Sequence, residues 1–244
     1  MIKKHQCVEE NKYGQSVGAA IENTQPIQFK EEDLFGTHVK LLNLKKFAVS
    51  QLQLKQLWQA TQSESDDRCW TYLPYAGFKT IVDLKSSLDR SFDFAESTHY
   101  LIEVKGEIVG WIALLNIRSQ SQAVEIGNVY FSHLMKQSTA ATEAIYLLLK
   151  CCFEQGFRRV EWKCDDLNQP SKRAALRYGF KFEGVFRQDR IAKGRNRNTA
   201  WFSMLDEEWL LLDTAYQAWL SIENFDEQAQ QKLRLSDFMK LYQG

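Results

Sequence analysis

Two side chains near the middle of the sequence could accept a proton from an attacking nucleophile. Glu125 begins the apolar and aromatic run EIGNVYF, where removal from water disfavours a charged carboxylate and favours proton uptake. His133 follows this run, and imidazole is the side chain that titrates nearest neutral pH. The alternatives are a carboxylate that is solvated or paired with an arginine, and an ordinary surface histidine. Glu125 is therefore the first candidate for a general base and His133 the second.

An anion site is the second chemical feature that the sequence indicates. A polar loop, residues 132–138, precedes a run of apolar residues at helical spacing, residues 139–155, which Thr139 is expected to cap. The start of a helix has unpaired N–H groups and a partial positive charge, so it suits a phosphate or pyrophosphate. Ala140 and Ala141 lack bulk and would let such a ligand approach. The alternative is an ordinary packed strand–loop–helix unit.

The segments around these residues alternate between strand and helix patterns. Strands are predicted at residues 37–44, 98–104, 108–117, 125–131, 159–165, 181–192 and 197–205. Helices are predicted at residues 46–62, 78–93, 139–155, 170–178 and 206–222, with a further helical stretch to about residue 242.

Five short patterns follow one another in the second half of the chain. They are Glu125-Ile126-Gly127, Lys136, Ala141-Thr142-Glu143-Ala144, Asn168 with Ser171, and Gly179-Phe180. Their order resembles the GNAT superfamily of acyl-CoA N-acyltransferases, and most closely its ribosomal-protein alanine N-acetyltransferases. The resemblance covers roughly residues 35–205. It implies an α/β GNAT fold: a mixed, twisted sheet of about seven strands with helices on both faces, followed by a helical C-terminal extension.

One departure from the family concerns its pyrophosphate motif, Gln/Arg-x-x-Gly-x-Gly/Ala. This motif falls on Lys136, Thr139 and Ala141, so that threonine replaces the central glycine. A backbone cradle for phosphate survives this change only if Thr139 does not need a positive φ, because a β-branched residue would be strained there.

The resemblance implies acetyl-CoA as co-substrate, no metal, and direct attack of a primary amine on the thioester. The family pattern also has an acidic residue at the position of Glu125, which agrees with its role as the candidate base. Ser171 could donate to the leaving sulfur, or it simply belongs to the first turn of its helix. Asn168 would bind pantetheine or cap the same turn. The expected CoA-binding residues are Val129, Tyr130, Phe131, Lys136, Gln137, Ser138, Thr139, Ala140, Ala141, Thr142, Asn168 and Ser171.

Two observations keep other functions open. The family's general acid, a tyrosine, is matched by Ala175, and Tyr178 is interpreted as a core residue, so the acid is unassigned. With the change at Thr139, this motivates a non-catalytic acyl-CoA-binding or interaction protein as the alternative. The basic stretch at residues 187–197 would suit the carboxylate of a succinyl donor, hence an N-succinyltransferase. The acceptor is a small molecule or a protein N-terminus.

The composition of the chain argues against several other classes of protein. The chain has 31 Lys and Arg against 31 Asp and Glu, which argues against nucleic-acid binding through a basic surface. Its five cysteines form no CxxC pair and suggest neither disulfides nor a zinc site. No apolar leader or membrane-length run is seen, so a cytoplasmic protein without a membrane partner is expected. We expect a polar N-terminal arm at residues 1–34, the acyltransferase domain at residues 35–205, and helices at residues 206–244 that pack on the domain or on a partner in a possible homodimer.

Overall fold

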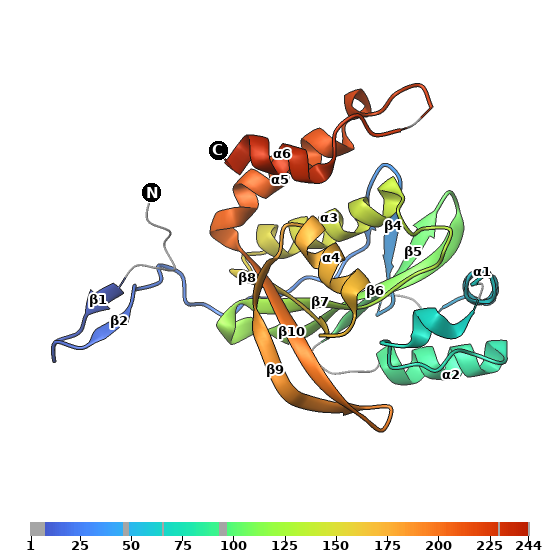
Figure 1. Cartoon of the computed structure of the whole chain (residues 1–244), viewed down its shortest axis with the longest axis horizontal. Helices are drawn as coiled ribbons and strands as arrows, with labels where there is room; N and C mark the ends of the chain where they lie inside the picture. Colours follow the sequence, from blue (N-terminus) through green and yellow to red (C-terminus); the bar gives the residue numbers. More distant parts are fainter. Residues whose placement is uncertain (1–7, 46–48, 65, 93–96, 229, 244) are drawn as a thin grey trace.

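An eight-stranded mixed sheet organises the computed structural model, which describes residues 8–45, 49–64, 66–92, 97–228 and 230–243 (Figure 1). The strand order is β3-β4-β5-β6-β7-β8-β10-β9, and β7 and β8 are parallel while the other neighbours are antiparallel. The strands are β3 (Leu34–Phe35), β4 (Lys40–Asn43), β5 (Thr98–Val104), β6 (Glu107–Arg118), β7 (Ala123–Phe131), β8 (Arg159–Asp165), β9 (Lys181–Ala192) and β10 (Arg195–Leu205). The expected mixed sheet is confirmed, with one strand more than the seven predicted because β3 pairs with β4 ahead of it.

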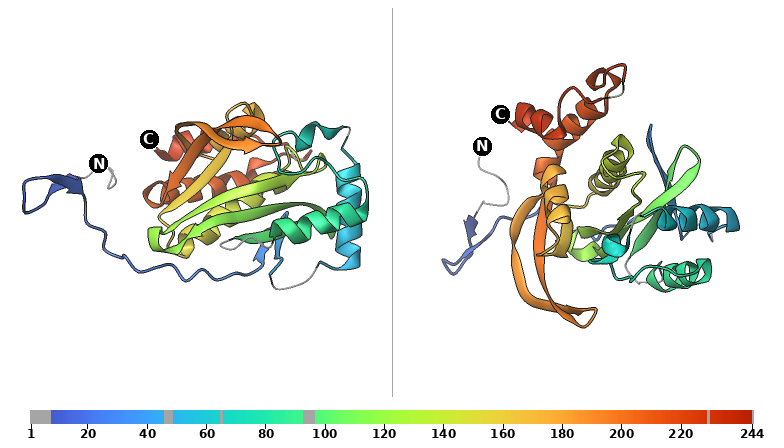
Figure 2. Two further views of the ribbon diagram at one scale, coloured as in Figure 1. Left: turned by 90° about the horizontal axis from the view of Figure 1, so that it is seen from below. Right: turned by 45° about the vertical axis from the view of Figure 1, so that its right-hand side comes forward.

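Helices cover both faces of the sheet, as predicted (Figures 1 and 2). One face packs α1 (Gln51–Gln62) and α2 (Ile81–Phe92) over a cluster of buried aromatic and aliphatic side chains, the aromatic core, which includes Trp70, Tyr75, Trp111 and Tyr130. The other face packs against a larger apolar core. Its helices are α3 (Thr139–Glu154), α4 (Gln169–Arg177), α5 (Asp206–Leu220) and α6 (Leu235–Gln243).

Local capping decides where the helices begin. Ser50 caps α1 in a reciprocal capping box with Gln53, so the helix begins later than the predicted residue 46, and residues 46–48 lie outside the described residues. The sequence predicts Thr139 as the cap of α3, and this prediction is wrong because the cap is Ser138. Ser138 has an extended backbone, and its Oγ accepts from the N–H of Ala141 at 3.2 Å, whereas Thr139 is already helical.

The N-terminal segment carries a small hairpin and then runs over the domain. Strands β1 (Val8–Glu10) and β2 (Ser16–Gly18) form the hairpin, which lies away from the sheet (Figure 2). Farther along, Gln122 Nε2 donates to the carbonyls of Asn23 at 2.9 Å and Gln25 at 2.8 Å. These bonds fasten the segment to the turn between β6 and β7.

The C-terminal helices pack on the same chain. Tyr216 of α5 stacks on Tyr146 of α3 at 5.3 Å between ring centroids, and its hydroxyl donates to the carbonyl of Tyr178 at 2.9 Å. Trp209 stacks on Phe153 at 5.1 Å.

The division of the chain at residues 34 and 205, and any homodimer, stay predictions. None of the helices in the described residues has the length and apolarity needed to cross a membrane.

We expect the buried face of α5 to be essential for stability. Leu212 is 1% exposed and Leu210 is 74% exposed on the same helix. Leu212→Ala should cost about 2–5 kcal/mol and lower the melting temperature by roughly 5–15 °C. Leu210→Ala should change stability by less than about 0.5 kcal/mol. Truncation before Asp206 should cause aggregation. A truncated chain as soluble and as stable as wild type would show that the helices are a detachable appendage.

Candidate functional site

The central feature of the site is the point where β7 and β8 stop pairing. The two strands pair in parallel over four residues only, from Ala123–Arg159 to Ile126–Trp162. Strand β7 then continues to Phe131 and β8 to Asp165 without pairing to each other. We call this separation the strand split. Backbone groups that face it lack a strand partner, so they are free to bind an extended ligand.

The loop after β7 leads to the start of α3, where the sequence predicts a phosphate site. Gln137 has the positive φ of this loop, at 62°, and Thr139 is not among the described residues with positive φ. The threonine therefore does not strain a cradle at this place. The amide of Ser138 donates to Met135 O at 3.2 Å and that of Ala141 to Ser138 Oγ. Within the described chain, the amides of Gln137, Thr139 and Ala140 donate to no residue.

Several side chains expected to contact CoA are occupied by packing. Ala140, Ala141 and Thr142 are buried, and Thr142 Oγ1 accepts from Arg177 at 3.0 Å. Tyr130 lies in the aromatic core, where its hydroxyl lies 3.2 Å from Ala60 O. Contacts of these four residues with a ligand would therefore involve the backbone. Val129 and Phe131 are half-buried against the larger core, on the α3 side of the sheet.

The loop side chains Lys136 and His133 bind the end of α1. Lys136 Nζ pairs with Glu64 Oε2 at 3.0 Å, and His133 Nδ1 lies 3.1 Å from Ser63 Oγ. His133 follows Phe131, the last residue of β7, and Glu125 lies six residues before Phe131. At the usual rise of a strand, this separates Glu125 from the end of β7 by roughly 20 Å. The structure therefore does not bring the two candidate bases together, and they are alternatives.

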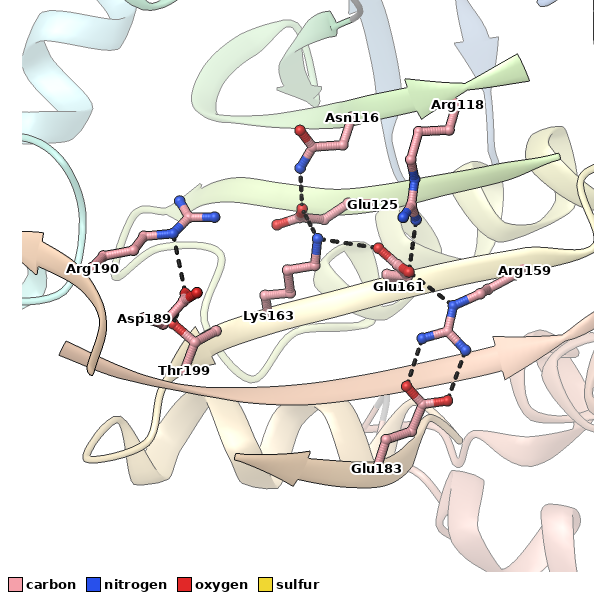
Figure 3. A network of polar contacts seen from close by, with 10 residues as sticks. All are labelled: Asn116, Arg118, Glu125, Arg159, Glu161, Lys163, Glu183, Asp189, Arg190 and Thr199. Atoms are coloured by element: carbon pink, nitrogen blue, oxygen red, sulfur yellow. Dashed lines mark hydrogen bonds and ion pairs between the residues drawn. The ribbon is translucent and has the colours of Figure 1, made fainter. Parts of the chain in front are cut away.

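Glu125 is 7% exposed and pairs with a buried lysine (Figure 3). Its Oε2 accepts from Asn116 Nδ2 at 2.5 Å and lies 2.9 Å from Lys163 Nζ. Lys163 Nζ is also 3.1 Å from Glu161 Oε2 and lies over the Trp201 ring, 3.9 Å from its centroid. Glu125 is thus neither solvated nor paired with an arginine, and its role as base stays a prediction.

The ion pairs continue across the sheet from Glu161 (Figure 3). Arg118 Nη2 and Arg159 Nε lie 2.6 and 2.8 Å from Glu161 Oε1, and Arg159 binds both carboxylate oxygens of Glu183. Burial by itself would raise the pKa of Glu161, but the hydrogen bonds from Arg118 and Arg159 outweigh it and lower the pKa to about 2. We call Glu125, Glu161, Glu183, Arg118, Arg159 and Lys163 the charge ladder.

Sequence reasoning missed the charge ladder, although β8 carries a signal for it. Arg159, Glu161 and Lys163 alternate with Val160 and Trp162, so the charged and apolar side chains occupy opposite faces. The apolar residues join the larger core beneath α3. The charge ladder therefore lies on the other face of the sheet.

The start of α4 forms the far side of the strand split. Asn168 Oδ1 accepts from the amide of Ser171 at 3.2 Å, and so caps the helix. Ser171 Oγ accepts from Trp162 Nε1 at 3.0 Å. Ala175 is fully buried, and Tyr178 is a core residue whose pKa is raised by burial. The general acid stays unassigned. The described residues contain no cluster of three or more metal-binding side chains.

Comparisons with known proteins agree on the family. The acetyltransferase (GNAT) domain family matches residues 48–181, more than half of the chain. No curated protein matches the chain. The crystal structure of a GCN5-related N-acetyltransferase from Brucella melitensis is 37% identical, with a TM-score of 0.84 over 90% of this chain and 100% of that chain. A GNAT-family protein from Chromobacterium violaceum is 32% identical, with a TM-score of 0.71 over 78% of this chain and 95% of that chain.

A more distant structure shares the fold. It is an acetyltransferase from Salmonella typhimurium that modifies the N-terminal serine of a 50S ribosomal subunit protein. Its identity is 18% and its TM-score 0.58, over 71% of this chain and 99% of that chain. The resemblance drawn from the five sequence patterns is confirmed: the chain belongs to the GNAT family of acetyltransferases.

Proposed function

We propose that this protein moves the acetyl group of acetyl-CoA to a primary amine by direct attack, without a covalent enzyme intermediate. The observation that carries the proposal is the strand split beside the capped start of α3, in a chain of the GNAT family. The two features supply the two things an acyl-CoA needs, which are a backbone edge for its extended arm and free amides for its phosphates.

The amides of Gln137, Thr139 and Ala140 are proposed to hold the pyrophosphate. They stand at the positive end of α3 and donate to no described residue. Lys136, now paired with Glu64, is proposed to add its charge to the same site. The pantetheine arm would then lie along β7 beyond Ile126, where backbone groups are unpaired.

Glu125 is proposed to take the proton from the acceptor amine, directly or through a water. Asn116 and Lys163 hold Oε2, so Oε1 is the oxygen left for proton transfer. Gly127 keeps the space beside it open, because an added Cβ would lie 3.2 Å from Oε1 and 2.8 Å from Leu115 Cδ1. The amine nitrogen bonds to the carbonyl carbon, unpaired N–H groups of β7 stabilise the oxygen, and the thiolate leaves toward the hydroxyl of Ser171.

The contacts of the basic stretch at residues 187–197 weaken the argument for a succinyl donor. Lys193 Nζ donates to the carbonyls of Trp70 and Tyr75 at 2.6 and 2.5 Å, and Arg190 pairs with Asp189. Two of its cations are thus already engaged.

The proposal is tested by following release of free thiol from acetyl-CoA and succinyl-CoA against small primary amines and peptides with free N-termini. Saturable CoA binding without any amine-dependent release would favour the non-catalytic alternative.

We expect Thr139→Glu to weaken acetyl-CoA binding by at least about tenfold, because its carboxylate would lie beside the pyrophosphate. A carboxylate in the first turn suits the helix dipole, so the variant should fold. Thr139→Gln, of equal size and no charge, should stay within about threefold of wild type. Titration calorimetry with acetyl-CoA measures both. Wild-type affinity in Thr139→Glu would place the phosphates elsewhere.

We expect Glu125→Gln to lower kcat by about 10²–10⁴-fold while acetyl-CoA affinity stays nearly unchanged, because glutamine cannot accept the proton. Raising the pH should partly restore the rate by supplying free amine. The control is Glu143→Gln. The Glu143 carboxylate is also buried but accepts from the amides of Thr37 and His38, so this variant should lose stability and keep its rate. Full activity of Glu125→Gln from about pH 6 to 9 would move the role to His133.

A further inference from the structure

Asn128 has an unusual backbone at the strand split. Its φ is 46°, in the left-handed region that asparagine tolerates better than most residues. The pairing of β7 with β6 shifts register here, from Trp111–Tyr130 to Ala113–Gly127, so Asn128 and Val129 both lie opposite Ile112. This is a β-bulge, and it lies just beyond Ile126, the last residue of β7 that pairs with β8.

The side chain of Asn128 is held on the face of the sheet that α1 and α2 cover. The Tyr75 hydroxyl donates to Asn128 Oδ1 at 3.2 Å and accepts from Nδ2 at 3.0 Å. Asn128 Oδ1 also accepts from Trp111 Nε1 at 3.5 Å, and Nδ2 lies 3.2 Å from His99 Nε2. Burial lowers the pKa of His99 to about 4, so its ring is neutral and can accept this proton.

Asn128 itself is half-buried, whereas its partners are shielded from water. Tyr75, His99 and Trp111 are all buried in the fold. The Tyr75 ring meets the Trp111 ring edge to face at 5.6 Å, and its carbonyl accepts from Lys193 Nζ at the tip of the β9–β10 hairpin. The partners of Asn128 are therefore themselves fixed, and loss of one would leave a buried polar group unpaired.

We propose that Asn128 is a positioning residue for acyl transfer: its side chain, held by Tyr75, fixes the bulge so that the free N–H groups of β7 point at the thioester carbonyl oxygen. This inference rests on the proposed function. Donors of this kind act only when they are placed in advance at the position of the developing charge. A displacement of the bulge would therefore reduce the rate of the chemical step more than the affinity for acetyl-CoA.

The first test measures the carbonyl itself. Acetyl-CoA labelled with ¹³C at the carbonyl is bound to the full chain, and its stretching band is recorded by isotope-edited infrared difference spectroscopy. Hydrogen bonding in wild type should lower the band relative to acetyl-CoA in water. Tyr75→Phe removes only the hydroxyl, and it should move the band back toward the value in water. It should also lower kcat about tenfold with KM for acetyl-CoA within about threefold.

Two matched controls separate positioning from stability. Tyr146→Phe also removes a hydroxyl with a partner, Asp213 at 3.0 Å, and should leave the carbonyl band and kcat unchanged. Asn128→Gly keeps the left-handed backbone accessible but removes the side chain, and should reproduce Tyr75→Phe. Gln122→Gly makes the same change at another left-handed residue with a bonded side chain, and should lower only the melting temperature.

The outcomes separate this inference from the proposed function. A wild-type carbonyl band in both Tyr75→Phe and Asn128→Gly would overturn the inference even if the enzyme acetylates amines. Absence of a lowered band in wild type would overturn it as well. A lowered band that both variants lose would support the inference even if no amine in the panel were acetylated, in which case only the proposed function would fail.

Discussion

The rest of the structure depends on the failure of β7 and β8 to pair beyond Ile126 and Trp162. On their other edges β7 pairs with β6 and β8 pairs with β10, so each strand at the gap belongs to a different half of the sheet. The two cores, one on each face, keep the sheet continuous on both sides of the strand split. Backbone groups left unpaired at such a place must find another partner, and an extended ligand is a partner with the right geometry.

The charge ladder beside the strand split is balanced, with three carboxylates against three cations. Glu125, Glu161 and Lys163 are its buried members, and removal of one of these three leaves an uncompensated buried charge that costs about 3–5 kcal/mol. Any loss of activity in a Glu125 variant therefore has two causes to separate, chemistry and stability. Glu143 is a suitable comparison because its carboxylate is also buried and hydrogen-bonded, to the amides of Thr37 and His38, but is not a member of the charge ladder.

Sequence patterns predicted the regular elements well and the links between them poorly. The bounds of β5, β8 and β9 agree with the prediction because apolar alternation and turn residues mark both ends of each strand. The start of α1 and the cap of α3 were misplaced, since a serine one or more residues away made the better hydrogen bond. The hydrogen bonds that hold the Asn128 side chain come from Tyr75, His99 and Trp111, which are too far apart in the sequence for any local pattern to predict them. An asparagine directly after Gly127 inside a strand was the one available signal of a bulge.

The two faces of the sheet divide the proposed work. The free amides at the start of α3 and the apolar side chains of β7 and β8 belong to one face, whereas Glu125 and the rest of the charge ladder belong to the other. A thioester bound along β7 from the α3 side can meet a base on the opposite side only through the strand split. The bulge at Asn128 stands at this crossing and is clamped from the second face. In the proposed function, the same four-residue limit on pairing supplies both the edge for the donor and the place where donor and acceptor meet.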